Sequence, residues 1–389
     1  NLPNIAPING DDIILTIDLN YQSILQEELK RRMLETSAKS AMGVIINPQT
    51  GAILAMSSVP SFDNNFFSEY PINQHHCKVL TDQFEPGSTF KIVAATAALA
   101  ENKISLTEEF NCEEGEYDYF GTTIKDHEPY GQLNPIQIIK HSSNIGIIKI
   151  AERIGSNSLY KYAKIFGFGT PTNIDIIGET SGKIKPERQW SRISLGQISM
   201  GHEVAVNTLQ LAVAFSAIAN HGYLIKPFII DKIYNQHEKK VENSAVVKRK
   251  IANEKIVLEI KNMLRQVVVD GTGTEADIPG WEVAGKTGTA QKYISGKYSN
   301  DHFISNFVGF LPASNPKLLS AIVLDEPESP MHWGGQGAAV AFKRIMQRII
   351  NMDDSISPPL KKTNKKENRL IISKEIKTEN KNKAFPVSL

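Results

Sequence analysis

The N-terminal part of the chain alternates between two spacings of apolar residues. Residues 11–17 contain the run Ile-Ile-Leu-Thr-Ile and predict a strand, whereas apolar residues recur at helical spacing between Asp18 and Met33. Aspartate is a common helix cap, so we expect this helix to begin after Asp18. Two further apolar runs, residues 42–46 and 52–56, flank an Asn-Pro-Gln-Thr-Gly segment and predict a hairpin in a buried sheet.

A long connection then leads to a stretch of different character. Residues 57–81, with their prolines, asparagines and aromatic residues, predict a surface connection. Pro86-Gly87 predicts a turn, and the residues that follow Ser88 are apolar on every side, which is typical of a helix buried all round. Ser88 would open that helix, where unpaired N–H groups and the helix dipole favour developing negative charge.

The middle of the chain is mainly helical in its pattern, and the C-terminal part returns to strands. A predicted helix begins at Asn134-Pro135, is interrupted by polar residues at 141–144 and resumes at Ile145. The remaining predicted elements are helices at 156–166, 207–220, 253–268 and 337–351, and strands at 282–292, 303–311 and 318–324. Strands near both ends of the chain predict one mixed α/β sheet covered by helices, with an all-helical insertion between its halves.

Composition and charge narrow the class of protein. The chain has 389 residues and a hydrophobic content of 41%, enough for a proper core. Residues 361–389 carry nine Lys and Arg against three Asp and Glu, so this end is net +6 and the rest is net −5. The basic residues have no interleaved aromatics, which argues against nucleic acid as a partner. No apolar run of about 18 residues predicts a membrane span.

The first candidate for chemistry is Ser88-x-x-Lys91. The spacing i, i+3 places a nucleophile and a possible base on one helix face, but a capping serine with a surface lysine gives the same pattern. Ser-x-x-Lys also occurs at Ser158 and Ser314, in an ordinary amphipathic stretch and across a proline, respectively. The Ser88 copy alone has surroundings suited to catalysis.

Two further motifs change the interpretation of Ser88. Ser142-Ser143-Asn144 interrupts an apolar helical region, and residues 286–289, Lys-Thr-Gly-Thr, enter a predicted strand. A polar helix kink and a turn at a sheet edge would explain each motif singly. Ser-x-x-Lys, Ser-x-Asn and Lys-Thr-Gly in this order resemble the motif set of penicillin-binding proteins and class A β-lactamases.

The resemblance extends from about residue 10 to residue 351. Residues 47–56, 85–91, 199–210 and 285–292 all look like a class B penicillin-binding protein. Residues 142–146 and 286–292 look most like the septal cell-division transpeptidase, because the elongation-specific relatives usually carry Asp where Asn144 stands.

That family implies a fold of the penicillin-binding and serine β-lactamase type. We expect an antiparallel sheet covered by helices, plus an all-helical subdomain at about residues 100–270. Residues 1–10 would be a linker from a missing upstream anchor and pedestal, residues 11–352 the transpeptidase domain, and residues 353–389 a disordered basic tail.

By resemblance, four residues form the catalytic group: Ser88 is the nucleophile, Lys91 its base, and Ser142 a proton relay between Lys91 and Lys286. A lysine is a base only when neutral, so Lys91 must be buried or lie near other cations, with Lys286 as the expected second cation.

The other site residues implied by the resemblance bind substrate. Asn144 would hold a substrate peptide amide, Thr287 and Thr289 the terminal carboxylate, and Gly288 would let the substrate lie against the strand. The backbone N–H groups of Ser88 and Thr289 would form the oxyanion hole. We expect Glu85 to be structural.

The implied activity is a peptidoglycan D,D-transpeptidase that acts through a serine acyl-enzyme and is a target of β-lactam antibiotics. Rival predictions are a serine β-lactamase or D,D-carboxypeptidase on the same fold, and a non-catalytic β-lactam sensor or division scaffold. The expected partners are peptidoglycan stem peptides, and, through missing upstream segments, a septal glycan polymerase and other division proteins. The expected location is the extracytoplasmic face of the cytoplasmic membrane, in the periplasm.

No cofactor or metal is expected. His75, His76 and Cys77 are adjacent and point in different directions, without a second ligand pair at a known spacing. Cys77 and Cys112 permit one disulfide or none.

Overall fold

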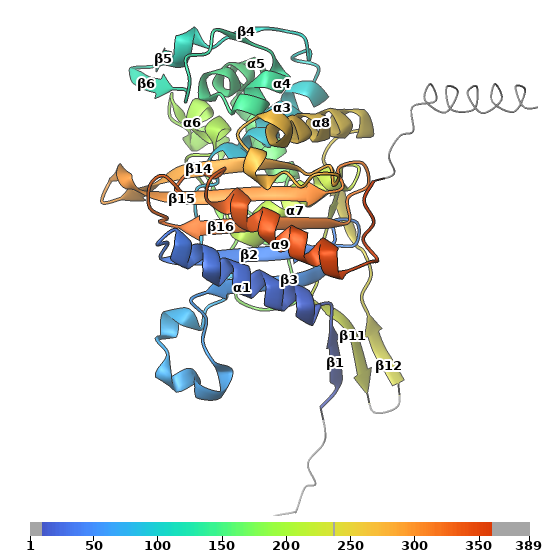
Figure 1. The fold of residues 1–389 in the computed structure, drawn as a ribbon. Coiled ribbons are helices and arrows are strands. Elements are labelled where there is room, and N and C mark those ends of the chain that lie inside the picture. The colour runs from blue at the N-terminus through green and yellow to red at the C-terminus, as the bar shows by residue number, and fades with distance from the viewer. Residues whose placement is uncertain (1–9, 236–237, 360–389) are drawn as a thin grey trace, which may run out of the picture.

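The computed structural model describes residues 10–235 and 238–359. Residues 1–9 of the predicted linker and residues 360–389 of the predicted tail lie outside the described residues. Within them, the centre of the molecule is a five-stranded antiparallel sheet in the order β14-β15-β16-β2-β3 (Figure 1). Its strands are β2 (Ser40–Ile46), β3 (Ile53–Val59), β14 (Ala284–Ile294), β15 (Lys297–Leu311) and β16 (Leu318–Asp325).

Helices cover both faces of this sheet. On one face α1 (Leu19–Glu35) and α9 (Ala338–Met352) pack against the strands and each other, and α7 (Thr208–Ala219) packs on the opposite face. Strand β16 contributes side chains to the hydrophobic core on both faces of the sheet. Leu319, Ala321 and Val323 belong to one core cluster, and Leu318, Ile322 and Leu324 belong to the other. This alternation follows from the period of two along a strand. The sheet therefore holds together segments from the two ends of the chain.

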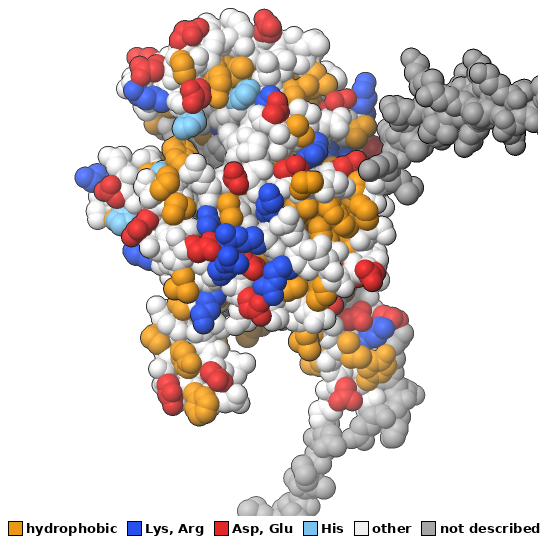
Figure 2. All heavy atoms as spheres, viewed as in Figure 1, with side chains coloured by type: hydrophobic (Ala, Val, Ile, Leu, Met, Phe, Trp, Pro, Cys, Tyr) orange, Lys and Arg blue, Asp and Glu red, His pale blue; other side chains and the backbone are white. Residues whose placement is uncertain are grey.

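The predicted helix starts are largely confirmed. Asp18 accepts hydrogen bonds from two backbone N–H groups at the start of α1, and Asn207 and Asn134 form capping boxes with Gln210 and Gln137. These caps satisfy N–H groups that have no partner inside the helix. Mixed charges gather over α1 and α9 on the face shown in Figure 2.

The insertion beside β14 is less purely helical than the sequence predicted. Its helices are α3 (Lys91–Ala100), α4 (Pro135–His141), α5 (Asn144–Ile165), α6 (Ser194–Met200) and α8 (Glu254–Asp270). Residues 100–270 also contain α7 and several short strand pairs: β4 (Phe110–Asn111) with β7 (Gln132–Leu133), β5 (Glu116–Tyr119) with β6 (Thr122–Lys125), β8 (Lys183–Ile184) with β9 (Val204–Ala205), and β10 (Tyr223–Ile225) with β13 (Val247–Lys250). Strands of two to four residues are too short to produce a recognisable period.

Two peripheral features complete the fold. Strand β1 (Asp12–Leu15) pairs with β11 (Ile230–Asn235), which pairs with β12 (Glu238–Glu242), in a small sheet apart from the central one. The connection after β3 holds only the short α2 (Lys78–Thr81) and two 3-10 turns, η1 (Asn64–Glu69) and η2 (Ile72–Gln74), as a surface connection should. Further 3-10 turns are η3 (Gly87–Phe90), η4 (Glu113–Gly115), η5 (Glu187–Gln189) and η6 (Thr274–Ala276).

Candidate active site

Ser88 lies in η3, a tight turn that leads directly into the buried helix α3. The turn packs against the outer edge of β14 and is tied to the insertion, because the Gly87 N–H donates to the Gly201 carbonyl at 3.2 Å. Gly87 has a φ of +56°, and a Cβ there would lie 2.6 Å from the Thr289 carbonyl oxygen. Glycine at this position therefore lets the serine turn approach the strand.

Lys91, one turn after Ser88, is completely buried. Its Nζ donates to the Ser142 carbonyl at 2.5 Å and to Asn144 Oδ1 at 2.8 Å, and Ser142 Oγ is 3.3 Å away. Burial lowers the pKa of Lys91 to about 7, although the charge of Asp126 acts in the opposite direction. A large fraction of Lys91 is therefore neutral near pH 7, as a base for Ser88 requires.

Lys286 reaches the same serine from the sheet. It is completely buried in β14, and its Nζ donates to Ser142 Oγ at 2.9 Å and to the Thr287 carbonyl at 3.2 Å. Burial, followed by repulsion from Lys91, lowers the pKa of Lys286 well below its ordinary value. Of the two expected causes of a lowered pKa at Lys91, burial is the main one here, and the role of Lys286 as a second cation stays a prediction.

Ser142 occupies the break between α4 and α5. Its φ of +61° is left-handed, and the neighbouring Ser143 caps α5 by accepting a hydrogen bond from the Gly146 N–H at 2.9 Å. A left-handed conformation at a non-glycine residue costs roughly 1–3 kcal/mol and persists only where the surroundings enforce it. The predicted interruption of the helix at 141–144 is thus confirmed, and it places Ser142 Oγ between the two lysine amines.

Asp126 enforces this break, and the sequence gave no sign of it. Its carboxylate accepts hydrogen bonds from the backbone N–H groups of Asn144 and Ile145, at 2.5 and 3.1 Å, and from Ser143 Oγ at 2.5 Å. The Asn144 side chain is also fixed, since its Nδ2 donates to the Lys125 carbonyl at 2.9 Å. Asn144 Oδ1 consequently faces Lys91.

The Lys-Thr-Gly-Thr strand presents two hydroxyl groups to neighbouring loops. Thr287 Oγ1 is 2.7 Å from Thr272 Oγ1, and Thr289 Oγ1 accepts from the Gly334 N–H at 2.9 Å. Gly288 has a different role from the predicted one. A Cβ at Gly288 would point into the protein, 2.6 Å from the Pro86 carbonyl oxygen and against the Asn306 side chain, and not toward a bound substrate. Glycine here allows η3 and β15 to pack against β14.

These residues surround one cavity of about 580 Å³. Ser88, Ser142, Asn144, Thr287 and Thr289 all line it, while Lys91 and Lys286 lie beneath its floor. The other lining residues are Met200, His127, His141, His202, Thr272, Pro330, Trp333, Gly334, Gly335 and Gln336. Its volume suits a small peptide-like ligand.

A comparison with protein families agrees with this geometry. The family described as penicillin-binding protein transpeptidase domain matches residues 41–347. The chain belongs to this family.

Curated relatives of this transpeptidase domain include several wall-synthesis proteins. The chain is 34% identical over 348 residues to the stage V sporulation protein D of Bacillus subtilis, covering 88% of the chain and 54% of the relative. It is 34% identical over 352 residues to the peptidoglycan D,D-transpeptidase FtsI of Buchnera aphidicola subsp. Baizongia pistaciae, covering 89% and 59%, respectively. The chain thus spans little more than half the length of these relatives.

Solved structures show the same architecture. Penicillin-binding protein 3 of Mycobacterium tuberculosis, in complex with aztreonam, superposes with a TM-score of 0.83 at 27% identity, over 91% of this chain and 82% of that one. The transpeptidase domain of Burkholderia pseudomallei penicillin-binding protein 3 gives 0.76 at 29% identity, over 88% and 98%. The predicted fold type, an antiparallel sheet with covering helices, is confirmed.

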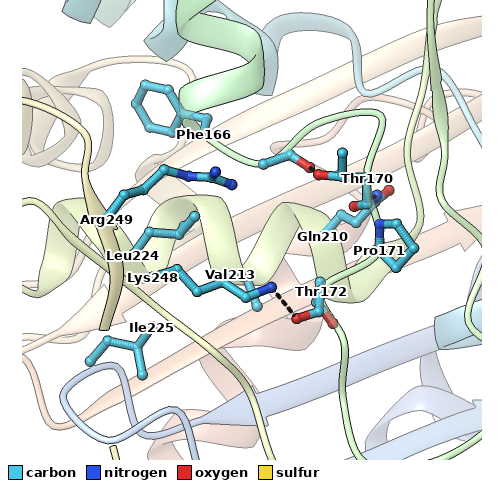
Figure 3. A pocket seen from close by; sticks show the side chains of 11 residues that line it. Phe166, Thr170, Pro171, Thr172, Gln210, Val213, Leu224, Ile225, Lys248 and Arg249 are labelled. Atoms are coloured by element: carbon cyan, nitrogen blue, oxygen red, sulfur yellow. Dashed lines mark hydrogen bonds between the residues drawn. The ribbon is translucent and has the colours of Figure 1, made fainter. Parts of the chain in front are cut away.

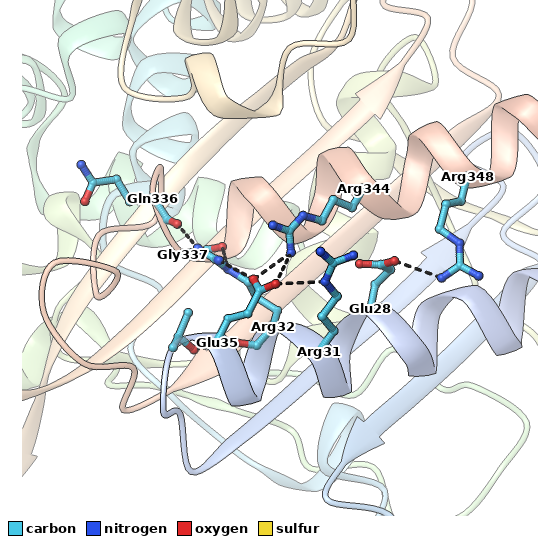
Figure 4. A network of polar contacts seen from close by, with 9 residues as sticks. Glu28, Arg31, Arg32, Glu35, Gln336, Gly337, Arg344 and Arg348 are labelled. Atoms are coloured by element: carbon cyan, nitrogen blue, oxygen red, sulfur yellow. Dashed lines mark hydrogen bonds and ion pairs between the residues drawn. The ribbon is translucent and has the colours of Figure 1, made fainter.

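One wall of the cavity of this transpeptidase domain, the loop at 330–337, was not predicted to contribute. The loop joins β16 to α9 and is tied to β14 through Gly334 and Thr289. From the opposite side it is held by the buried Arg32 of α1, whose guanidinium donates to the carbonyls of Gln336 and Gly337 (Figure 4). The run of glycines at 334, 335 and 337 was the available signal in the sequence.

A second cavity in the transpeptidase domain lies apart from this site and is much smaller. It holds about 20 Å³ between the loop at 166–172, α7 and β13, with Lys248 and Arg249 on one side (Figure 3). That volume is enough for about one water molecule. Lys248 Nζ already donates to the Thr172 carbonyl at 2.6 Å, so this cavity adds nothing to the active site.

Three other observations on the transpeptidase domain concern its cysteines, metal binding and membrane-spanning helices. Cys77 and Cys112 are both free thiols. Over residues 10–235 and 238–359 there is no group of three or more His, Cys, Asp or Glu that could hold a metal ion. In the same ranges no helix has the length and apolar character needed to cross a membrane.

Proposed function

We propose that this chain is the catalytic domain of a peptidoglycan D,D-transpeptidase that cross-links stem peptides during septal wall synthesis. The observation that carries the proposal is the convergence of Ser88, Lys91, Ser142 and Lys286 at one cavity, with Ser142 Oγ between both lysine amines. The name of the Buchnera relative, a peptidoglycan D,D-transpeptidase, supports the reaction. Its division-type name supports the septal assignment.

The first half of the reaction forms an acyl-enzyme. Neutral Lys91 takes the proton of Ser88 Oγ, which bonds to the carbonyl carbon between the two terminal D-alanines. The oxyanion accepts hydrogen bonds from the backbone N–H groups of Ser88 and Thr289, each worth about 3 kcal/mol in the transition state. The C–N bond breaks, and the leaving D-alanine amine receives a proton through Ser142.

The strand β14 would bind the terminal carboxylate of the donor. Thr287 and Thr289 offer hydroxyl groups on the cavity wall, and Lys286 lies directly beneath them. A bound carboxylate would favour the protonated form of Lys286, because opposite charges at close range stabilise each other in a buried site. Substrate binding itself would thus oppose the lowering of the Lys286 pKa that burial causes.

In the second half, an amine of another stem peptide attacks the ester and forms the cross-link. We further propose that this chemistry takes place on the extracytoplasmic face of the cytoplasmic membrane, together with a septal glycan polymerase, which the wall-synthesis names of the relatives support.

β-Lactams mimic the D-alanyl-D-alanine bond and would acylate the same serine. After incubation with benzylpenicillin, we expect intact-mass analysis to find one adduct that persists for many minutes and is absent from Ser88→Ala. Ser158→Ala is the matched control, because it removes the serine of another Ser-x-x-Lys copy and should keep the adduct. An adduct that clears within seconds would favour a β-lactamase.

Turnover separates the enzyme from a sensor or scaffold. A D-alanyl thioester offered with an acceptor amine should give an amide product, and release of the free acid alone would indicate a carboxypeptidase. Acylation by penicillin without any thioester turnover would favour a non-catalytic β-lactam sensor.

A further inference from the structure

The transpeptidation reaction has a proton balance that the two lysines and Ser142 do not close. An acceptor amine in water near neutral pH is an ammonium group, and its conversion to an amide removes two protons. One returns to Ser88 Oγ when the ester C–O bond breaks, and Lys91 with Ser142 can deliver it. The other needs an acceptor that can pass it on to solvent, and Lys91 and Lys286, both completely buried, have no such access.

The cavity contains a group suited to this task. Three histidines line it, and one of them, His202, has its Nδ1 2.8 Å from the Glu85 Oε2 carboxylate oxygen. With the carboxylate ionised, Nδ1 keeps its proton and donates it to Glu85. The other nitrogen, Nε2, is then left as a proton acceptor.

Glu85 is itself held by groups from two other elements. Its Oε1 accepts from the Glu203 backbone N–H at 2.9 Å and from the Tyr298 hydroxyl at 3.2 Å. The Tyr298 ring meets the His202 imidazole edge to face, with centroids 5.3 Å apart. The imidazole orientation is thus fixed from the loop before η3, from its own loop and from β15.

His202 also lies beside the nucleophile turn. The carbonyl of the preceding residue, Gly201, accepts a hydrogen bond from the Gly87 N–H. A Cβ added at Gly201 would collide with the Gly87 backbone. The loop that carries His202 and the turn that carries Ser88 are therefore in direct backbone contact. Both side chains face the same cavity.

We propose that His202 is a further catalytic residue, which accepts the second proton of the acceptor ammonium at Nε2 and passes it to solvent. The amine nitrogen then bonds to the ester carbonyl carbon, its remaining excess proton goes to Ser88 Oγ, and the imidazolium is deprotonated by water. Glu85, Glu203 and Tyr298 are the titratable groups around the imidazole, and Glu85 is its positioning residue. This inference rests on the proposed function, because it assigns a role within that reaction.

The test separates acylation from aminolysis. The acyl-enzyme would be formed from a D-alanyl thioester, and its capture by glycylglycine would be measured against pH. In His202→Gln we expect capture by the amine to fall about 100-fold, the usual contribution of a positioned acid–base group, with a changed dependence on pH. Glu85→Gln should give a smaller loss of the same kind, and the penicillin acylation rate should fall much less in both variants.

A matched control and a rescue keep the test decisive. His221 makes the same contact with Glu254, Nδ1 to Oε1 at 2.9 Å, on the exposed surface, so His221→Gln should behave as the wild type. Added imidazole should restore aminolysis in His202→Ala, which a purely structural role would not allow. Wild-type aminolysis in His202→Gln, or equal losses of acylation and aminolysis without rescue, would overturn the proposal. Failure of the transpeptidase assignment itself would instead appear in the wild type, which would give no amide product from the thioester and the acceptor amine.

Discussion

Among the described residues, buried basic side chains lie in two regions, and their surroundings differ. At the active site, Lys91 and Lys286 contact hydroxyl, amide and carbonyl oxygens, and burial lowers the pKa of both amines. Between α1 and α9, the buried Arg32 forms an ion pair with Glu35 at 2.8 Å and donates to two loop carbonyls (Figure 4).

Glu35 explains why the second region keeps its charges. Partial burial alone would raise the pKa of Glu35, but hydrogen bonds from Arg32, Arg344 and Arg31 outweigh this and lower its pKa to about 2. Arginine cannot deprotonate in a protein, so pairing is the way to bury it. The comparison teaches that a buried lysine without a hydrogen-bonded carboxylate has a lowered pKa, as a base requires, whereas the paired arginine keeps its charge and holds the loop in place.

The largest expected effect concerns the base. Lys91→Met should lower the rate of acylation by benzylpenicillin by about 10²–10⁴-fold, the contribution of a general base. In the wild type, the same rate should rise with pH through about 7 and then level, because only neutral Lys91 accepts the Ser88 proton. Stopped-flow acylation from pH 5 to 9 checks both results, and a rate that is flat through pH 7 would contradict the assignment of Lys91.

The same lysine should destabilise the fold near neutral pH. Its pKa is about 7 when folded and near 10.5 when unfolded, so the unfolded chain binds the extra proton and stability rises with pH between these values. Relative to Lys91→Met, the wild-type free energy of unfolding should therefore increase from pH 7 to 10, by at most about 1.36 kcal/mol per pH unit. Urea titrations of both proteins at each pH measure this difference in the free energy of unfolding.

The control for this linkage is a paired lysine. Lys149 is mostly buried but lies 2.5 Å from Glu113, and Lys149→Met should not produce the same gain with pH. If both variants changed stability equally with pH, burial without a carboxylate would not be the cause.

The residues that carry the chemistry of the site could be predicted from the sequence better than the residues that hold them in position. Ser88, Lys91, Ser142 and Lys286 were recognisable because the family motifs are local, and the polar break at 141–144 indicated the irregular backbone at Ser142. Asp126, which holds that break, lies in a loop about 16 residues upstream, and no periodic pattern links the two segments.

The errors in the sequence interpretation have physical causes of the same kind. The role of Gly288 depends on Asn306 and Pro86, which only the folded sheet brings against it. The strand at 303–311 begins six residues earlier, at Lys297, in a polar segment without alternation, and this extension carries Tyr298 to Glu85. The lowered pKa of Lys286 follows from burial, which a motif does not report.

A smaller effect is expected from the arginine region. Arg32→Met should leave the Gln336 and Gly337 carbonyls unsatisfied and loosen the loop that bonds to Thr289. We expect a loss of stability of about 3–5 kcal/mol, because Glu35 and the carbonyls lose a buried partner, and a several-fold lower acylation rate. Arg348→Met is the control: Arg348 also joins α9 to α1, through Glu28 and Glu27, but does not contact the loop, so acylation should stay at the wild-type rate. Equal acylation rates in the two variants would contradict a link between the arginine region and the cavity wall.

The smallest effect should come from Arg31, which completes the comparison. Arg31 pairs with the same Glu35 at 2.9 Å, but its side chain is 59% exposed and the two residues are one helical turn apart. Exposed pairs at i, i+4 contribute about 0.2–0.5 kcal/mol, and Arg32 and Arg344 would still hold Glu35. Arg31→Ala should therefore change the midpoint of urea unfolding only slightly and leave acylation at the wild-type rate. Arg31 and Arg32 are adjacent and share the Glu35 carboxylate. If Arg31→Ala lost as much stability as Arg32→Met, the charge of the network would be the cause, and not the burial of Arg32 against the loop.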